Sequence, residues 1–195
     1  MNDTVVLYVH GFKSSARAAK ASMTRDYIRD YEVDLSFDAM DLANTPAEAF
    51  SDMCGLVEKY LNKGVRVCLI GSSMGGFLSM YLSAKYNLKA VLINPCVYPW
   101  NYLETVKGRQ INVYTGDEFE VNDQHVADAR KIAESYEINP QNLAVYLQRG
   151  DEVLDYVDAS VLLGRSALVH IEDGGCHQFD HYEFCLPEII RFLRS

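Results

Sequence analysis

Short apolar runs alternate along this chain with segments of helical character. Runs that are apolar throughout suit strands buried on both faces, and strands that alternate with helices favour a parallel sheet between two helical layers. The runs cover residues 5–9, 33–37, 65–70, 90–93, 143–147 and 167–171. The sequence therefore predicts an α/β fold with a mostly parallel sheet of about six strands flanked by helices, and its 195 residues suit a single domain, residues 1–195.

Helix signals support this alternation at two places. Thr45 and Glu48 form a capping-box pair with Pro46 at the first helical position, and Gly64 stops the helix before the third run. The last helix, about residues 182–193, contains Pro187, so we expect a kink there or a later start.

Residues 97–140 interrupt the alternation with a segment rich in aromatic and acidic residues. A long excursion between two strands of a compact α/β domain is often a lid over the site. We therefore expect a lid-like insertion, helical around residues 125–136, in which Trp100 and Tyr102 contact the substrate. The alternative is a packed insertion that shields an edge of the sheet.

Charge and cysteine content narrow the choice of partners. The formal net charge is −9, and an acidic chain is repelled by nucleic acid and by anionic membranes, so a small-molecule partner is expected. No apolar stretch approaches the roughly 20 residues of a membrane span, and residues 1–4 lack the basic start of a signal peptide. The five cysteines include no CxxC pair, which argues against a disulfide framework or a zinc site and favours the cytoplasm.

The segment Gly71-Ser72-Ser73-Met74-Gly75-Gly76 follows the third run and precedes an apolar helical segment, residues 77–86. This is a G-x-S-x-G motif in the strand, tight turn and helix context that serine hydrolases require. The glycines leave room around a strained serine, whose hydroxyl then stands clear at the carboxyl end of the sheet. Ser73 is the predicted nucleophile, and Ser72 is out of register.

The alternative for this segment is a glycine-rich turn without chemistry, or a phosphate cradle. A P-loop needs lysine and Ser or Thr after its second glycine, and a dinucleotide fingerprint needs G-x-G-x-x-G; the segment has neither. Because Ser73 begins a helix, the backbone N–H of Met74 can face a developing oxyanion. Phe12, in His10-Gly11-Phe12 after the first strand, is the candidate for the second oxyanion donor, and His10 is expected to brace that loop.

Loops after the last two strands supply an acid and a base. Asp151 stands at the exit of the fifth run, whereas Asp155 has a ready alternative role as the cap of the helix over residues 157–163. His177 lies in a glycine-containing loop ahead of the last helix and is the predicted general base. The remaining histidines in the later part of the chain lie in a strand, at a helix start and in the insertion: His170, His181 and His125.

Ser73, Asp151 and His177 follow one another in the chain order of an α/β-hydrolase triad. In such a triad His177 takes the proton of Ser73, Asp151 orients the imidazole, and water releases the acyl group from the serine. The sequence thus predicts hydrolysis of acyl esters or thioesters.

Further motifs make the chain resemble the YqiA/YcfP-type esterases, a small bacterial branch of the α/β-hydrolase superfamily. They are His10-Gly11-Phe12 with Ser14-Ser15, the serine turn, Asn94-Pro95 with Pro99, Tyr114-Thr115-Gly116, Gly150-Asp151-Glu152-Val153-Leu154-Asp155-Tyr156 and Gly174-Gly175-Cys176-His177. The resemblance implies a compact hydrolase fold that lacks the first strands of larger relatives, and activity on acyl esters or acyl-CoA thioesters without a cofactor. It assigns the triad to the same three residues. Cys176 and Gln178, on either side of the histidine, depart from the family's pattern.

Two other classes of function fit the same residues. An acyltransferase or a small peptidase would use the same triad, because the triad fixes acyl transfer and leaves the acceptor open. A catalytically silent homologue would keep the fold and use the aromatic insertion to hold a ligand.

Overall fold

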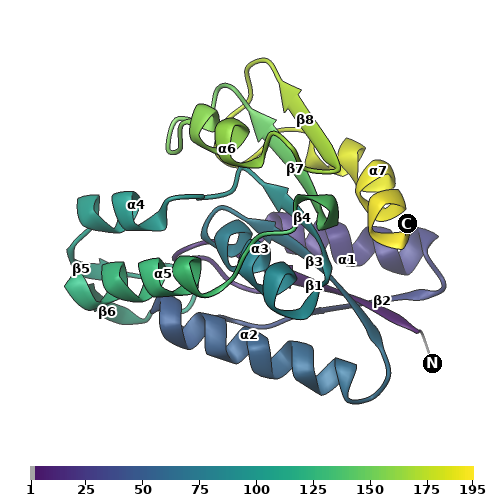
Figure 1. Cartoon of the computed structure of the whole chain (residues 1–195), viewed down its shortest axis with the longest axis horizontal. Helices are drawn as coiled ribbons and strands as arrows, with labels where there is room; N and C mark the ends of the chain where they lie inside the picture. The colour runs from purple at the N-terminus through teal and green to yellow at the C-terminus, as the bar shows by residue number, and fades with distance from the viewer. Residues whose placement is uncertain (1–2) are drawn as a thin grey trace.

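The six apolar runs form one parallel sheet in the order β2-β1-β3-β4-β7-β8 (Figure 1). The computed structural model describes residues 3–195. The strands are β1 (Thr4–Val9), β2 (Leu35–Ala39), β3 (Arg66–Ser72), β4 (Lys89–Ile93), β7 (Leu143–Gln148) and β8 (Leu168–Glu172). Every neighbouring pair in this sheet is parallel, which confirms the predicted α/β architecture.

Helices cover both faces of the sheet, which explains why its four central strands, β1, β3, β4 and β7, are buried and largely apolar on both faces. Val5 and Leu7 of β1 pack in the core beneath α2 (Pro46–Leu61), α3 (Met74–Tyr86) and α6 (Tyr156–Leu163). Val6 of the same strand packs in the opposite core, beneath α1 (Ala19–Tyr31) and α7 (Tyr182–Arg194). Within residues 3–195, no helix is both long enough and apolar enough to cross a membrane.

The predicted helix boundaries hold for α2 and for α7. The hydroxyl of Thr45 accepts a hydrogen bond from the backbone N–H of Glu48, and Pro46 occupies the first turn, as the capping signal indicated. Helix α7 runs from Tyr182 to Arg194 with Pro187 inside it, so of the two effects expected of this proline the later start is wrong, and the kink stays a prediction.

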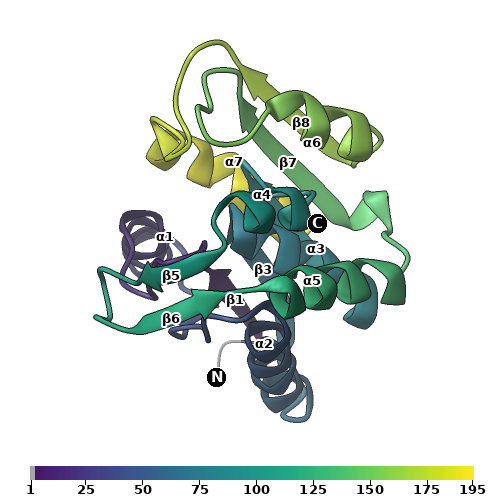
Figure 2. The ribbon, with the colours of Figure 1, turned by 90° about the vertical axis from the view of Figure 1, so that its left-hand side faces the viewer.

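The insertion between β4 and β7 contains more structure than its sequence indicated. It consists of α4 (Pro99–Thr105), β5 (Gly108–Ile111), β6 (Glu118–Val121) and α5 (Asp123–Ser135), and the 3-10 helix Pro140–Asn142 leads into β7. The expected helix is present as α5, whereas the antiparallel β5–β6 pair, which forms a separate sheet, was not predicted. Figures 1 and 2 show these elements gathered at one end of the molecule.

The insertion is anchored in the main core. Leu103 of α4 and Ala129 of α5 are buried in the same cluster as strands β1, β3 and β4. Its aromatic residues also meet the loop that follows β1, because the Phe12 ring lies edge-on to those of Tyr102 and Phe119, at centroid distances of 6.0 and 5.6 Å. The insertion therefore lies against the end of the sheet from which the loops after β1 and β3 emerge.

Candidate active site

The parallel sheet brings the loops after β1, β3, β4, β7 and β8 to one edge. Strand ends are in register there, with Val9 opposite Gly71 and Gln148 opposite Glu172. The carboxyl ends of parallel strands are where α/β proteins place their sites. The predicted site residues in these loops therefore all lie at the same edge of the sheet.

Ser73 occupies the turn between β3 and α3. Its φ of 56° and ψ of −120° lie outside the regions that residues with side chains prefer, as a strained nucleophile turn requires. Two hydrogen bonds join its backbone to the end of β4 and the loop that follows. Ser73 N–H donates to the Ile93 carbonyl at 3.1 Å, and Cys96 N–H donates to the Ser73 carbonyl at 3.0 Å. Ser72 belongs to β3 and is buried.

Close backbone approach explains two glycines of the turn. A side chain at Gly75 would overlap the carbonyl oxygens of Val9 and His10, and one at Gly71 would overlap the Gly75 carbonyl and the Ser79 hydroxyl. The absence of these side chains lets the start of α3 lie against the end of β1. Ser73 is thereby placed beside the loop that contains Phe12.

The side chains of Ser73, His177 and Asp151 form a continuous hydrogen-bonded series. Ser73 Oγ lies 3.1 Å from His177 Nε2, and His177 Nδ1 lies 2.9 and 2.8 Å from the two carboxylate oxygens of Asp151. An ionised carboxylate can only accept, so Nδ1 carries the hydrogen and Nε2 is free to accept from the serine. The side chains of Asp151 and His177 are 2% and 14% exposed.

The carboxylate of Asp151 is buried but fully partnered. Besides the imidazole, Oδ1 accepts hydrogen bonds from the backbone N–H groups of Val153 at 2.9 Å and Leu154 at 2.8 Å. Such bonds offset the cost of removing a charge from water. Asp155 instead accepts from Val157 N–H at 2.9 Å and caps α6, the role that its position in the sequence indicated. The structure thus brings Asp151 to His177.

Two buried amides that sequence reasoning missed hold the His177 loop. Asn94, after β4, donates from Nδ2 to the Cys176 carbonyl at 3.0 Å. Gln148, at the end of β7, accepts from Cys176 N–H at 3.1 Å and from Asp180 N–H at 2.9 Å. The two residues are only 2% and 1% exposed, so water cannot replace these hydrogen bonds and the loop backbone serves as their partner. The signal in the sequence was a polar residue at the end of a fully apolar strand.

A cavity of about 140 Å³ opens beside the serine. Its lining includes the two predicted oxyanion donors, Phe12 and Met74, and the predicted substrate contact Tyr102. The other lining residues are Ser73, Cys96, Val153, Leu154 and His177. Apart from the serine and the imidazole, the wall is largely apolar. Burial, and secondarily the charge of Asp151, raise the pKa of the Cys96 thiol to about 12, so this thiol stays protonated at neutral pH.

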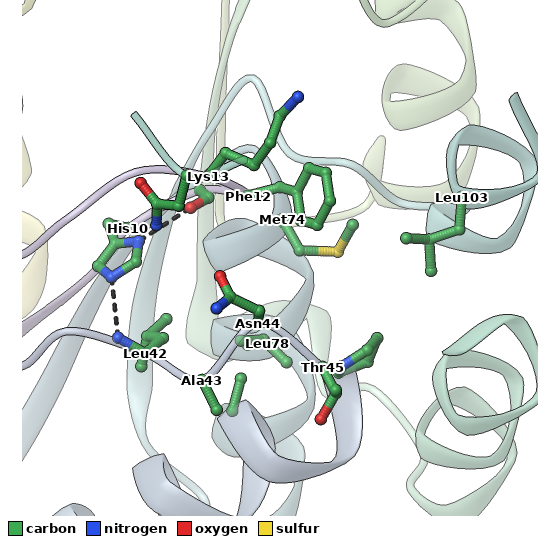
Figure 3. A pocket seen from close by; sticks show the side chains of 14 residues that line it. His10, Phe12, Lys13, Leu42, Ala43, Asn44, Thr45, Met74, Leu78 and Leu103 are labelled. Atoms are coloured by element: carbon green, nitrogen blue, oxygen red, sulfur yellow. Dashed lines mark hydrogen bonds between the residues drawn. The ribbon is translucent and has the colours of Figure 1, made fainter. Parts of the chain in front are cut away.

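His10 braces the loop after β1, as expected. Its Nδ1 lies 2.8 Å from the Gly11 carbonyl, and Nε2 accepts a hydrogen bond from Leu42 N–H at 3.0 Å (Figure 3). Burial lowers the pKa of His10, which favours the neutral ring that this pair of bonds requires. The loop that bears Phe12 is therefore tied to the segment before α2.

Trp100, the other predicted substrate contact, is not brought to this cavity. Its ring packs 5.6 Å from that of Tyr98, and the Arg130 guanidinium lies 5.1 Å from its centroid. The three histidines that were not assigned to the site make other contacts. His170 stacks on Tyr146, His181 stacks on Phe184, and His125 forms a capping box with Asn122 at the start of α5.

One cluster within residues 3–195 has the composition of a metal site. His170, Glu172 and Cys185 offer ligand atoms that all lie within 4.8 Å of one another. Burial raises the pKa of Cys185 to about 11, which disfavours the thiolate that a metal would need. These residues are absent from the lining of the cavity beside Ser73.

Solved structures share this architecture across nearly the whole chain. Est1E from Butyrivibrio proteoclasticus, with ferulic acid bound, matches at a TM-score of 0.76 and 13% identity over 98% of this chain and 88% of that one. Mouse alpha/beta hydrolase domain-containing protein 10 matches at 0.70 and 15% over 97% and 89%. Esterase Pf2001 from Pyrococcus furiosus matches at 0.64 and 13% over 99% and 81%. The fold is that of the α/β hydrolases, as predicted.

The family is given by a second comparison. The chain belongs to the uncharacterised protein family UPF0227, whose model matches residues 5–194. This membership confirms the resemblance to the YqiA/YcfP type that the sequence motifs indicated.

The glycine contacts at the serine turn generate a prediction about stability. We expect Gly75→Ala to lower the free energy of unfolding by about 3 kcal/mol or more, because the added methyl group overlaps the backbone of β1. The control is Gly55→Ala in α2, where nothing lies within 4 Å of the added carbon and a gain of up to about 1 kcal/mol is expected. Urea unfolding measures both; equal effects of the two substitutions would contradict the packing argument.

Proposed function

We propose that this chain is a serine hydrolase that cleaves acyl esters or thioesters, with Ser73 as nucleophile, His177 as general base and Asp151 as the triad acid. The observation that carries the proposal is the hydrogen-bonded series from Ser73 Oγ through the imidazole to a buried carboxylate. Two features support it: the strained conformation of Ser73 at a helix start, and an open cavity at the same atom.

The first half of the reaction follows from these contacts. Ser73 Oγ attacks the acyl carbon while His177 Nε2 takes its proton, and the carbonyl oxygen becomes an oxyanion. Asp151 keeps the imidazole in the required tautomer and stabilises the imidazolium. The N–H groups of Phe12 and Met74 are the proposed donors to the oxyanion, each worth about 10²–10³ in rate.

The second half releases both products. The tetrahedral intermediate collapses when the bond from carbon to the alcohol oxygen or thiol sulfur breaks, and the leaving atom takes the proton from His177. A water molecule then attacks the acyl-serine, again with His177 as base, which frees the acid and restores Ser73. The apolar wall formed by Met74, Tyr102 and Leu154 suits the acyl chain.

The nucleophile is tested by replacing each serine of the turn. We expect Ser73→Ala to abolish hydrolysis of 4-nitrophenyl butyrate and covalent labelling by a fluorophosphonate probe, with the fold retained by circular dichroism. Ser72→Ala is the matched control and keeps most activity, because Ser72 is a buried residue of β3 and lies one position before the turn. Turnover near that of the parent in purified Ser73→Ala would sink the mechanism.

The acid is tested by a pair of asparagine variants. We expect Asp151→Asn to lower turnover near neutral pH by orders of magnitude, about 10⁴ in the comparable protease substitution, because the amide permits the wrong imidazole tautomer. Asp155→Asn stays close to the parent, since asparagine caps a helix nearly as well as aspartate. Steady-state kinetics and melting temperatures measure both. A reversed ranking at equal folding would move the acid role to Asp155.

The acyl wall is tested by shortening two aromatic residues of α4. We expect Tyr102→Ala to shift the preferred acyl chain towards longer esters, because it widens the cavity beside Ser73 and each methylene contact is worth about 1–3 kcal/mol in discrimination. Trp100→Ala, checked for folding, is the control and keeps the parent's profile of kcat/KM against chain length. Superimposable profiles for Tyr102→Ala and the parent would remove Tyr102 from the acyl site.

A further inference from the structure

A second cavity adjoins the same catalytic residues but differs in chemistry. It has a volume of about 190 Å³ and, like the first, includes Phe12, Ser73 and His177 in its lining. The rest of its wall is largely polar, and its polar residues include Lys13, Ser14, Lys20 and Tyr114. Two compartments of opposite character therefore meet at the serine and the imidazole.

The two lysines of this cavity have neutral partners. Lys13 Nζ donates to the Gln110 side-chain oxygen at 2.9 Å, and Lys20 Nζ donates to the Gln178 carbonyl at 2.7 Å. Among the ion pairs of residues 3–195, none involves either ammonium group. Both ammonium groups therefore border the polar cavity beside Ser73 without a carboxylate partner in the described part of the chain.

Burial dominates the electrostatics of the Lys20 ammonium. It lowers the pKa of this group; Cys176 opposes the shift, and no carboxylate of residues 3–195 does. Ala18 and Ala19, at the start of α1, also line the cavity, and that helix has neither a capping side chain nor an acidic residue in its first turn. The dipole of α1 therefore adds to the positive field of the two lysines.

The position of His177 indicates which cavity binds the acyl group of a substrate and which binds the leaving group. The leaving atom must lie beside His177 to receive its proton, and the apolar cavity suits the acyl chain. The polar cavity, which also contains His177, is then the compartment left for the departing alcohol or thiol.

From this arrangement we infer that the Lys13–Lys20 cavity binds a negatively charged group, a carboxylate or a phosphate, on the leaving-group side of the substrate. The inference rests on the proposed function and narrows it: the preferred substrates are acyl esters or thioesters of anionic alcohols or thiols. Charge-assisted hydrogen bonds to one or both ammonium groups would orient the departing part against His177.

Matched esters test this inference with the acyl group held constant. The substrates are 4-butyryloxybenzoate, its neutral amide 4-butyryloxybenzamide, and 4-butyryloxyphenyl phosphate, so that a carboxylate, a neutral group and a phosphate occupy the same position. We expect the parent to prefer the anionic esters at low ionic strength, and added NaCl to reduce that preference. The relative values for the two anionic esters distinguish a carboxylate site from a phosphate site.

Lysine variants separate the effect of the two ammonium groups on kcat/KM from the intrinsic reactivity of the esters. We expect Lys13→Met and Lys20→Met each to lower the ratio of kcat/KM for the anionic ester to that for the amide by about tenfold. Lys63→Met, an exposed lysine after α2 that is absent from the lining of both cavities, removes the same charge and leaves the ratio unchanged. A ratio that is the same in all four proteins would overturn the inference while the proposed hydrolase activity stands.

A binding measurement separates failure of the cavity from failure of the chemistry. Titration of Ser73→Ala with 4-hydroxybenzoate and 4-hydroxybenzamide, followed by calorimetry, needs no turnover. We expect the carboxylate to bind more tightly, and the difference to vanish when Lys13→Met or Lys20→Met is added. Equal affinity of Ser73→Ala for the two compounds would overturn the anion site. A lysine-dependent preference in a chain that cleaves none of the esters would support the site and overturn the proposed function.

Discussion

The backbone of Ser73 has a conformation that residues with side chains adopt only when their surroundings impose it, at a cost of about 1–3 kcal/mol. Both neighbouring strands of β3 impose it here. On one side, the Ile93 carbonyl at the end of β4 and the Cys96 N–H just after it bind the serine backbone. On the other side, Gly75 lies against the carbonyl of Val9. Helix α3 is buried from Met74 to Ser83, and the burial of its apolar side chains offsets the strain.

The loop that contains His177, the proposed base, is restrained differently. Phe179 anchors it in the core beneath α1 and α7, and two buried amides, Asn94 and Gln148, add hydrogen bonds to its backbone. Glu152 adds a further bond, from His177 N–H to its carboxylate at 2.9 Å. Each bond contributes about 0.5–1.5 kcal/mol, but a broken one would leave a buried polar group unpartnered at a cost of about 1–3 kcal/mol. The spacing of serine and imidazole is thus set by the ends of β4 and β7.

Sequence reasoning located all six strands of the main sheet from their apolar residues. The four central strands β1, β3, β4 and β7 are buried on both faces, whereas the edge strands β2 and β8 are largely half-buried or exposed. Sequence reasoning also selected Ser73, Asp151 and His177, which the structure brings within hydrogen-bond distance, since parallel strands must deliver their loops to one edge. The β5–β6 pair was not predicted because each strand has only 4 residues, of which Val121 alone is buried, and Arg109, Glu118 and Glu120 are charged and exposed. Trp100 was selected for its aromatic character alone, and the direction in which α4 presents it depends on packing against α5, which no local pattern encodes.

The anchored insertion has a consequence for how molecules enter and leave. Leu103, Val126 and Ala129 share one core with the central strands, so lifting α4 and α5 away would expose apolar surface at about 25 cal/mol per Å². The tip between β5 and β6 carries no such penalty: Val113 and Tyr114 are 81% and 59% exposed. Tyr114 also lines the polar cavity. Displacing this hairpin tip therefore exposes far less apolar surface than detaching α4 and α5 would, and it leaves the hydrophobic core undisturbed.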